Sequence, residues 1–176
     1  MVTFAEPGTL EWIESGGGPL IAVPETVLPF WAGADGDETA SDYDRACEVD
    51  APVGLLPVGD GAALVLGDEP AATAYLPDHG VFVRWCAADS EADLLAGVPS
   101  ALATADWERE VHWKVPGPAV LFDSAWPGRE TERTEHLRVG LTPGTYAVRA
   151  AHARPGPETW MILVQLRRLP QGDTLR

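Results

Sequence analysis

The sequence predicts an α+β protein that is mostly antiparallel β-sheet, with two or three short helices in its N-terminal half and a strand-rich C-terminal half. Three observations support this fold class. Short apolar segments separated by Gly, Pro and Asp turns recur along the 176 residues. Helix-capping patterns occur near residues 41 and 89. From Trp107 onward the apolar segments have the pattern of strands with basic edges.

The first expected elements are two strands around a glycine turn. Residues 11–15 alternate weakly and end in the stretch GGGP at 16–19, and an apolar strand over 19–23 follows. The stretch does not match a phosphate loop, because it lacks the GK[ST] and G-x-G-x-x-G patterns and ends in proline where a helix would have to begin. Residues 24–31 then favour a short helix interrupted near Pro29.

The next expected helix covers residues 41–49, with a cap at its first or second residue. At helical spacing Tyr43 and Cys47 share one face, which we expect to point toward the core. The acidic Asp44 and Glu48 share another face, which we expect to point outward.

Apolar segments joined by turn residues predict hairpins through the rest of the chain. A Gly-Asp-Gly turn at 59–61 joins two strands, and a Pro-Gly turn at 143–144 joins two more. An acidic first turn predicts a helix over 89–96. The expected strands cover residues 53–58, 62–66, 73–76, 81–87, 108–114, 119–122, 136–141, 145–152 and 158–169.

Charge divides the chain into two parts. Residues 1–110 carry 21 acidic and three basic side chains, a net charge of −18, whereas residues 111–176 carry six acidic and nine basic ones, a net charge of +3. The pattern of elements changes in the same region. These changes predict an acidic α+β subdomain over 1–98 and a β-rich subdomain over 99–176, or one continuous domain.

The net charge of −15 also limits the kind of partner. Nucleic acids and anionic membranes require clustered positive charge, so we expect neither. A basic partner is favoured, because opposite fields steer association; solubility is the alternative reason for an acidic surface. The chain has no apolar stretch of the ~18 residues that a membrane span needs. Its first residues do not match a secretory signal. We therefore expect a cytoplasmic protein.

The sequence does not match the enzyme motifs that its cysteines, histidines and serines could form. Acidic neighbours of Cys47 disfavour the thiolate that a nucleophile requires, and we expect Cys47 and Cys86 to be buried structural residues. The four histidines lack the short paired spacings of zinc ligands, and G-x-S-x-G is absent. We expect no catalytic residue, metal or cofactor. A carboxylate pair that the fold brings together stays open as an alternative.

An acidic segment with an aromatic residue beside it is the strongest candidate for a functional site. Tight protein interfaces place aromatic anchors inside a charged rim. The residues expected to contact a protein partner are Trp31, Asp35, Asp37, Glu38, Asp42, Asp44, Glu48 and Asp50.

Several stretches, taken in order, resemble a known family. They are WIESGGGPLI at 12–21, DYDRAC at 42–47, PVGDGAALVLGDEP at 57–70, VRWCAADS at 83–90, and the later LFDSAWPG and GTYAV. From about residue 12 to 169 the chain resembles the immunity protein 21 family of bacterial polymorphic toxin systems.

The resemblance implies a cytoplasmic protein that binds and neutralises a cognate toxin and carries no catalytic residues. The acidic charge fits a basic toxin of the nuclease type, whose phosphate-binding surface an acidic inhibitor would cover. The alternatives are an enzyme of unrecognised type and a non-catalytic acidic structural or regulatory module.

Overall fold

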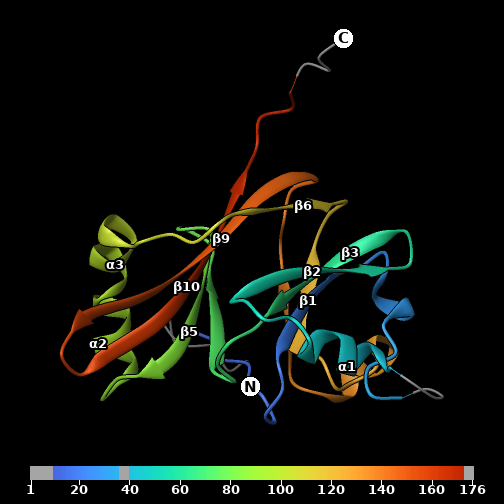
Figure 1. Cartoon of the computed structure of the whole chain (residues 1–176), viewed down its shortest axis with the longest axis horizontal. Coiled ribbons are helices and arrows are strands. Elements are labelled where there is room, and N and C mark those ends of the chain that lie inside the picture. The colour runs from blue at the N-terminus through green and yellow to red at the C-terminus, as the bar shows by residue number, and fades with distance from the viewer. Residues whose placement is uncertain (1–9, 36–39, 173–176) are drawn as a thin grey trace, which may run out of the picture.

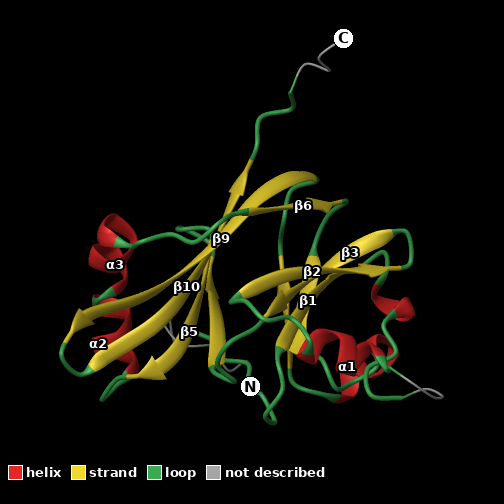
Figure 2. Cartoon of the chain, in the orientation of Figure 1, coloured by secondary structure: helices red, strands yellow, loops and turns green. Residues whose placement is uncertain are grey.

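The computed structural model describes residues 10–35 and 40–172 and contains two five-stranded antiparallel sheets (Figures 1 and 2). The β1 sheet has the strand order β2-β3-β1-β7-β8, and the β10 sheet has the order β4-β5-β10-β9-β6. The strands are β1 (Leu20–Pro24), β2 (Val53–Val58), β3 (Gly61–Leu66), β4 (Ala72–Leu76), β5 (Val81–Ala87), β6 (Val111–Val115), β7 (Ala119–Asp123), β8 (His136–Val139), β9 (Gly144–Gly156) and β10 (Thr159–Arg168). The predicted fold class is confirmed.

Short helices cover the outer faces of the two sheets (Figure 1). The helices are α1 (Asp42–Cys47), α2 (Glu91–Ala96), α3 (Val98–Thr104) and the 3-10 helices η1 (Leu28–Phe30) and η2 (Gly128–Arg133). α1 and η1 lie against the β1 sheet, whereas α2 and α3 lie against the β10 sheet. The sequence pattern did not predict α3, whose second residue is a proline.

Alternating side chains of the strands divide between three apolar cores. In β1, Leu20 and Ala22 pack between the two sheets, whereas Ile21 and Val23 pack beneath η1 and α1. β10 divides its apolar residues in the same way between the inter-sheet core and the core beneath α2 and α3. Strands covered on both faces explain why these segments are almost continuously apolar.

Both sheets combine strands from the two ranges 1–98 and 99–176. β1 pairs with β7 in one sheet, and β5 pairs with β10 in the other. The chain passes from β3 in the first sheet to β4 in the second through residues 67–71, which we call the crossover loop.

Arg84 holds the crossover loop from inside the protein. It lies on β5 with an exposed fraction of 0%, on the strand face that also carries Phe82 of the inter-sheet core. Its guanidinium donates hydrogen bonds to the carbonyl oxygens of Gly67 and Glu69. Burial lowers the pKa of Arg84 to about 10, which leaves it charged at neutral pH. Asp68, between the two carbonyls, has a φ of 65°, a left-handed conformation that persists where its surroundings hold it.

Candidate functional site

Two of the predicted acidic residues fix α1 in place. The Ser41 hydroxyl accepts a hydrogen bond from the backbone N–H of Asp44, and the Asp44 carboxylate accepts one from the backbone N–H of Ser41. The Asp42 carboxylate accepts hydrogen bonds from the backbone N–H of Ala32 at 2.8 Å and from the Arg45 guanidinium at 2.7 Å. The carboxylates of Asp42 and Asp44 therefore stabilise the position of α1 in addition to carrying negative charge.

The other predicted residues differ in exposure. Asp37 and Glu38 lie outside the described residues. The acidic residues exposed on or beside α1 are Asp35, Asp44, Glu48 and Asp50, and Asp42 is half-buried. We call these five residues the α1 acidic surface.

Trp31 lies in the core beneath α1, which corrects its expected place at the surface. Its exposed fraction is 0%, and its indole N–H donates a 3.0 Å hydrogen bond to the carbonyl oxygen of Ser124. Phe30 and Trp126 are the large apolar side chains exposed in the described part of the chain, at 65% and 46%. Their segments are joined by a 2.8 Å backbone hydrogen bond from Gly128 to Trp31. The segments that carry the exposed aromatic residues therefore meet at the buried one.

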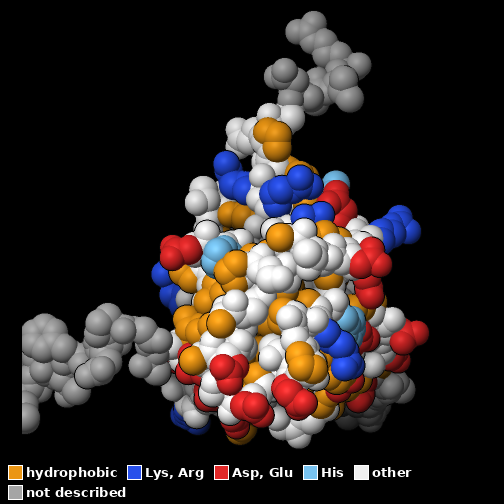
Figure 3. Space-filling view, turned by 90° about the vertical axis from the view of Figure 1, so that its left-hand side faces the viewer, with side chains coloured by type: hydrophobic (Ala, Val, Ile, Leu, Met, Phe, Trp, Pro, Cys, Tyr) orange, Lys and Arg blue, Asp and Glu red, His pale blue; other side chains and the backbone are white. Residues whose placement is uncertain are grey.

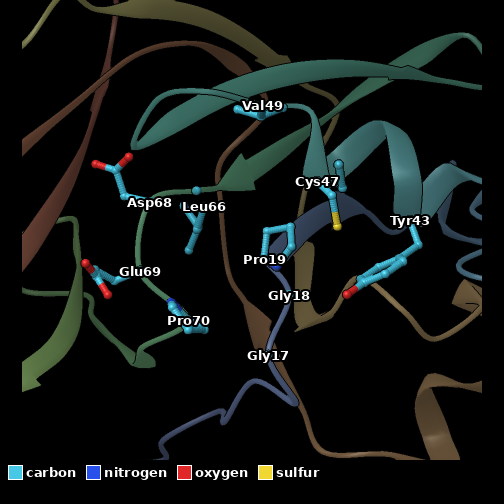
Figure 4. Close-up of a pocket in the computed structure, with 12 residues that line it drawn as sticks. Gly17, Gly18, Pro19, Tyr43, Cys47, Val49, Leu66, Asp68, Glu69 and Pro70 are labelled. Atoms are coloured by element: carbon cyan, nitrogen blue, oxygen red, sulfur yellow. The ribbon is translucent and has the colours of Figure 1, made fainter.

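A pocket of about 250 Å³ opens beside α1 (Figure 4). Its lining residues come from the glycine turn, α1 with the segment that follows it, and the end of β3 with the crossover loop. Its apolar lining residues include Pro19, Val49, Leu66 and Pro70. Figure 4 shows the Tyr43 hydroxyl and the Cys47 thiol turned toward the glycine turn. The pocket thus combines apolar walls with polar atoms.

The expectation that Tyr43 and Cys47 face the core is wrong. α1 buries Ala46 instead, and Cys47 is exposed. The Tyr43 ring lies against Gly18, where a Cβ atom would overlap the hydroxyl. A hydrogen bond with Cys47 is the main cause that raises the pKa of Tyr43, so this hydroxyl is neutral at physiological pH. Close approach to a glycine is a packing mode that helical periodicity does not reveal.

Nearly all the stretches that carry the family resemblance meet around this pocket. GGGPL, DYDRAC and LGDEP contribute lining residues. VRWC contributes Arg84, which holds the crossover loop. LFDS contributes Asp123, whose carboxylate accepts a 2.8 Å hydrogen bond from the N–H of Gly16, and Ser124, whose hydroxyl donates to the carbonyl oxygen of Pro19.

The two cysteines should differ strongly in reactivity. Cys86 is half-buried, and burial raises the pKa of its thiol from 9.0 to about 11, which lowers its thiolate fraction about 100-fold. Cys47 is exposed. We expect N-ethylmaleimide at pH 7.5 to modify Cys47 at least ~20-fold faster than Cys86. Peptide mass spectrometry over time measures both rates, and equal rates in the folded protein would contradict the described burial.

The end of the molecule opposite α1 carries side chains of both charges (Figure 3). Figure 3 views the end that lies at the left of Figure 1, where Lys and Arg side chains gather at the base of the C-terminal segment and acidic side chains lie mainly below them. This end therefore carries both signs. The α1 acidic surface lies against the outer face of the other sheet.

Within residues 10–35 and 40–172, no three His, Cys, Asp or Glu side chains form a group suited to a metal ion. In the same ranges, no helix has the length and apolar character needed to cross a membrane.

The fold defines a class of protein: a small α+β protein with two stacked antiparallel sheets, with acidic residues on and beside α1 and a pocket of about 250 Å³ next to that helix. The chain belongs to the immunity protein 21 family, whose model matches residues 11–159. It is therefore an immunity protein, and the family implies a toxin as its partner. Searches of curated proteins and of solved structures find no match.

Proposed function

We propose that this immunity protein acts in the cytoplasm, binds a basic toxin of a polymorphic toxin system through the α1 acidic surface, and blocks the toxin's active surface. The observation that carries the proposal is the concentration of exposed carboxylates on α1 and its flanking segments, in a member of an immunity family. A toxin of the nuclease type fits this surface, because a nuclease offers positive charge where it binds phosphate.

The aromatic side chains next to the acidic residues supply the apolar part of such an interface. Phe30 and Trp126 are exposed on segments that contact the buried Trp31. Aromatic anchors within a charged rim carry most of the binding energy in many interfaces. Carboxylates at the rim mainly raise the association rate.

Charge reversal tests the location of the interface. Asp42 and Asp44 are unsuitable targets, because both hold α1 through hydrogen bonds. The double variant Glu48→Lys/Asp50→Lys changes exposed residues after the last turn of α1, where a cation suits the helix dipole. We expect this variant to associate with the toxin about 10-fold more slowly at low salt, with unchanged thermal stability. Stopped-flow or surface plasmon resonance kinetics measure the effect.

The matched control is Asp78→Lys/Asp89→Lys, which changes the net charge equally through exposed residues near α2. It should slow association by less than ~3-fold. Equal effects of the two double variants would contradict the proposed location. The proposed function itself would fail if the wild-type protein did not bind the product of the adjacent toxin gene or rescue growth in its presence.

A further inference from the structure

The pocket beside α1 has the size of a site for one side chain. Its volume of about 250 Å³ is below the range of about 300–1,000 Å³ that is typical of pockets for whole small-molecule ligands. It opens next to the proposed interface, because Tyr43 and Cys47 line it from the same short helix that carries Asp44 and ends at the C-cap Glu48. A partner on the α1 acidic surface would therefore lie beside the pocket.

We propose that this pocket receives a single arginine or lysine side chain of the toxin, an inference that rests on the proposed function. Arg and Lys pack a long apolar stem along apolar surface while the charged group reaches polar atoms. The pocket offers both kinds of contact. Pro19, Val49 and Leu66 provide apolar walls, and the neutral Tyr43 hydroxyl provides an acceptor.

Charge selects a cation over an anion at this position. Of the described residues that line the pocket, Asp68 and Glu69 are charged and none is basic. The nearby basic side chains already have partners: the Arg84 guanidinium is buried against the carbonyl oxygens of the crossover loop, and the His152 Nε2 lies 3.1 Å from the Asp68 carboxylate. A side chain with an apolar stem and a positive end matches this combination.

The pocket is already formed in the free protein. The Tyr43 ring is fixed on one side by its contact with Gly18. The crossover loop is fixed on the other side by Arg84. A preformed pocket avoids the cost of ordering its walls when the partner binds, which favours a slow dissociation rate.

Protection of Cys47 from alkylation tests whether the pocket is occupied. The protein is treated with N-ethylmaleimide alone and in complex with an inactivated form of the adjacent toxin, and modification of each cysteine is followed by mass spectrometry. We expect bound toxin to slow modification of Cys47 at least ~10-fold. An unchanged rate in a complex that forms normally would overturn the pocket proposal and leave the proposed function intact. Failure to form a complex would instead contradict the proposed function.

Three substitutions of Cys47 test the chemistry of the occupant. Cys47→Ser preserves the size of the side chain and serves as the reference, and the thermal midpoint shows that each variant is folded. Cys47→Phe fills the pocket and should accelerate dissociation of the toxin at least ~10-fold. Cys47→Asp adds negative charge and should bind at least as tightly as Cys47→Ser. Normal binding by Cys47→Phe, or binding by Cys47→Asp that is more than ~3-fold weaker than the reference, would overturn the proposal.

Discussion

Replacing Arg84 with alanine should reduce the free energy of unfolding by about 3 kcal/mol. The side chain is completely buried, and its guanidinium donates to the carbonyl oxygens of Gly67 and Glu69. Without it, both carbonyls lose their donor and the inter-sheet core gains a cavity. Removal of a buried cation also relieves its desolvation cost, which is why the expected loss is smaller than the sum of these terms. Urea denaturation of the purified protein measures the change.

The matched control is Arg138→Ala. Arg138 lies on β8 and pairs with Glu25, but its side chain is 61% exposed. Exposed ion pairs contribute little, so this variant should lose less than ~1 kcal/mol. A loss at Arg84 no greater than at Arg138 would show that the crossover loop does not depend on the buried guanidinium.

The α+β class could be predicted because local patterns decide it. The Asp-Gly turn specified the β2–β3 hairpin, and a serine followed by acidic residues specified α1 together with its cap at Ser41. The pairing between distant strands, such as β1 with β7, depends on contacts that a linear pattern does not contain. Charge and pattern divide the chain near residue 98, whereas the sheets join strands from both sides of it.

The candidate site was predicted less well, for a reason visible in three residues. Acidic side chains are rarely fully buried, so Glu48 was correctly expected to be exposed. The burial of Trp31 and the exposure of Cys47 depend on which neighbours cover them. A helix of six residues that buries one alanine gives periodicity too little length to identify its inner face. The pocket forms where segments that are distant in the sequence meet. The motifs therefore indicated the family but did not predict the pocket.

Trp31→Ala should destabilise the protein by about 4 kcal/mol and lower its thermal midpoint by about 10 °C. The indole fills the core beneath α1, and its N–H satisfies the Ser124 carbonyl. Trp31→Phe keeps most of the apolar volume and should lose about 1–2 kcal/mol, because the carbonyl then has no donor. Differential scanning calorimetry ranks the two variants, and equal midpoints for Trp31→Ala and the wild type would contradict the buried position.

The adjacent residue provides the decisive comparison. Phe30 is 65% exposed, so Phe30→Ala should change stability by less than ~1 kcal/mol. If Phe30 anchors the toxin, the same variant should weaken binding about 10-fold, mainly through faster dissociation. Trp31→Ala, measured below its melting transition, should weaken binding less than Phe30→Ala does. If Trp31→Ala weakened binding more than Phe30→Ala, toxin binding would depend more on the packing of the core beneath α1 than on the exposed side chain of Phe30. Two neighbouring aromatic residues thus separate a contribution to folding from a contribution to recognition.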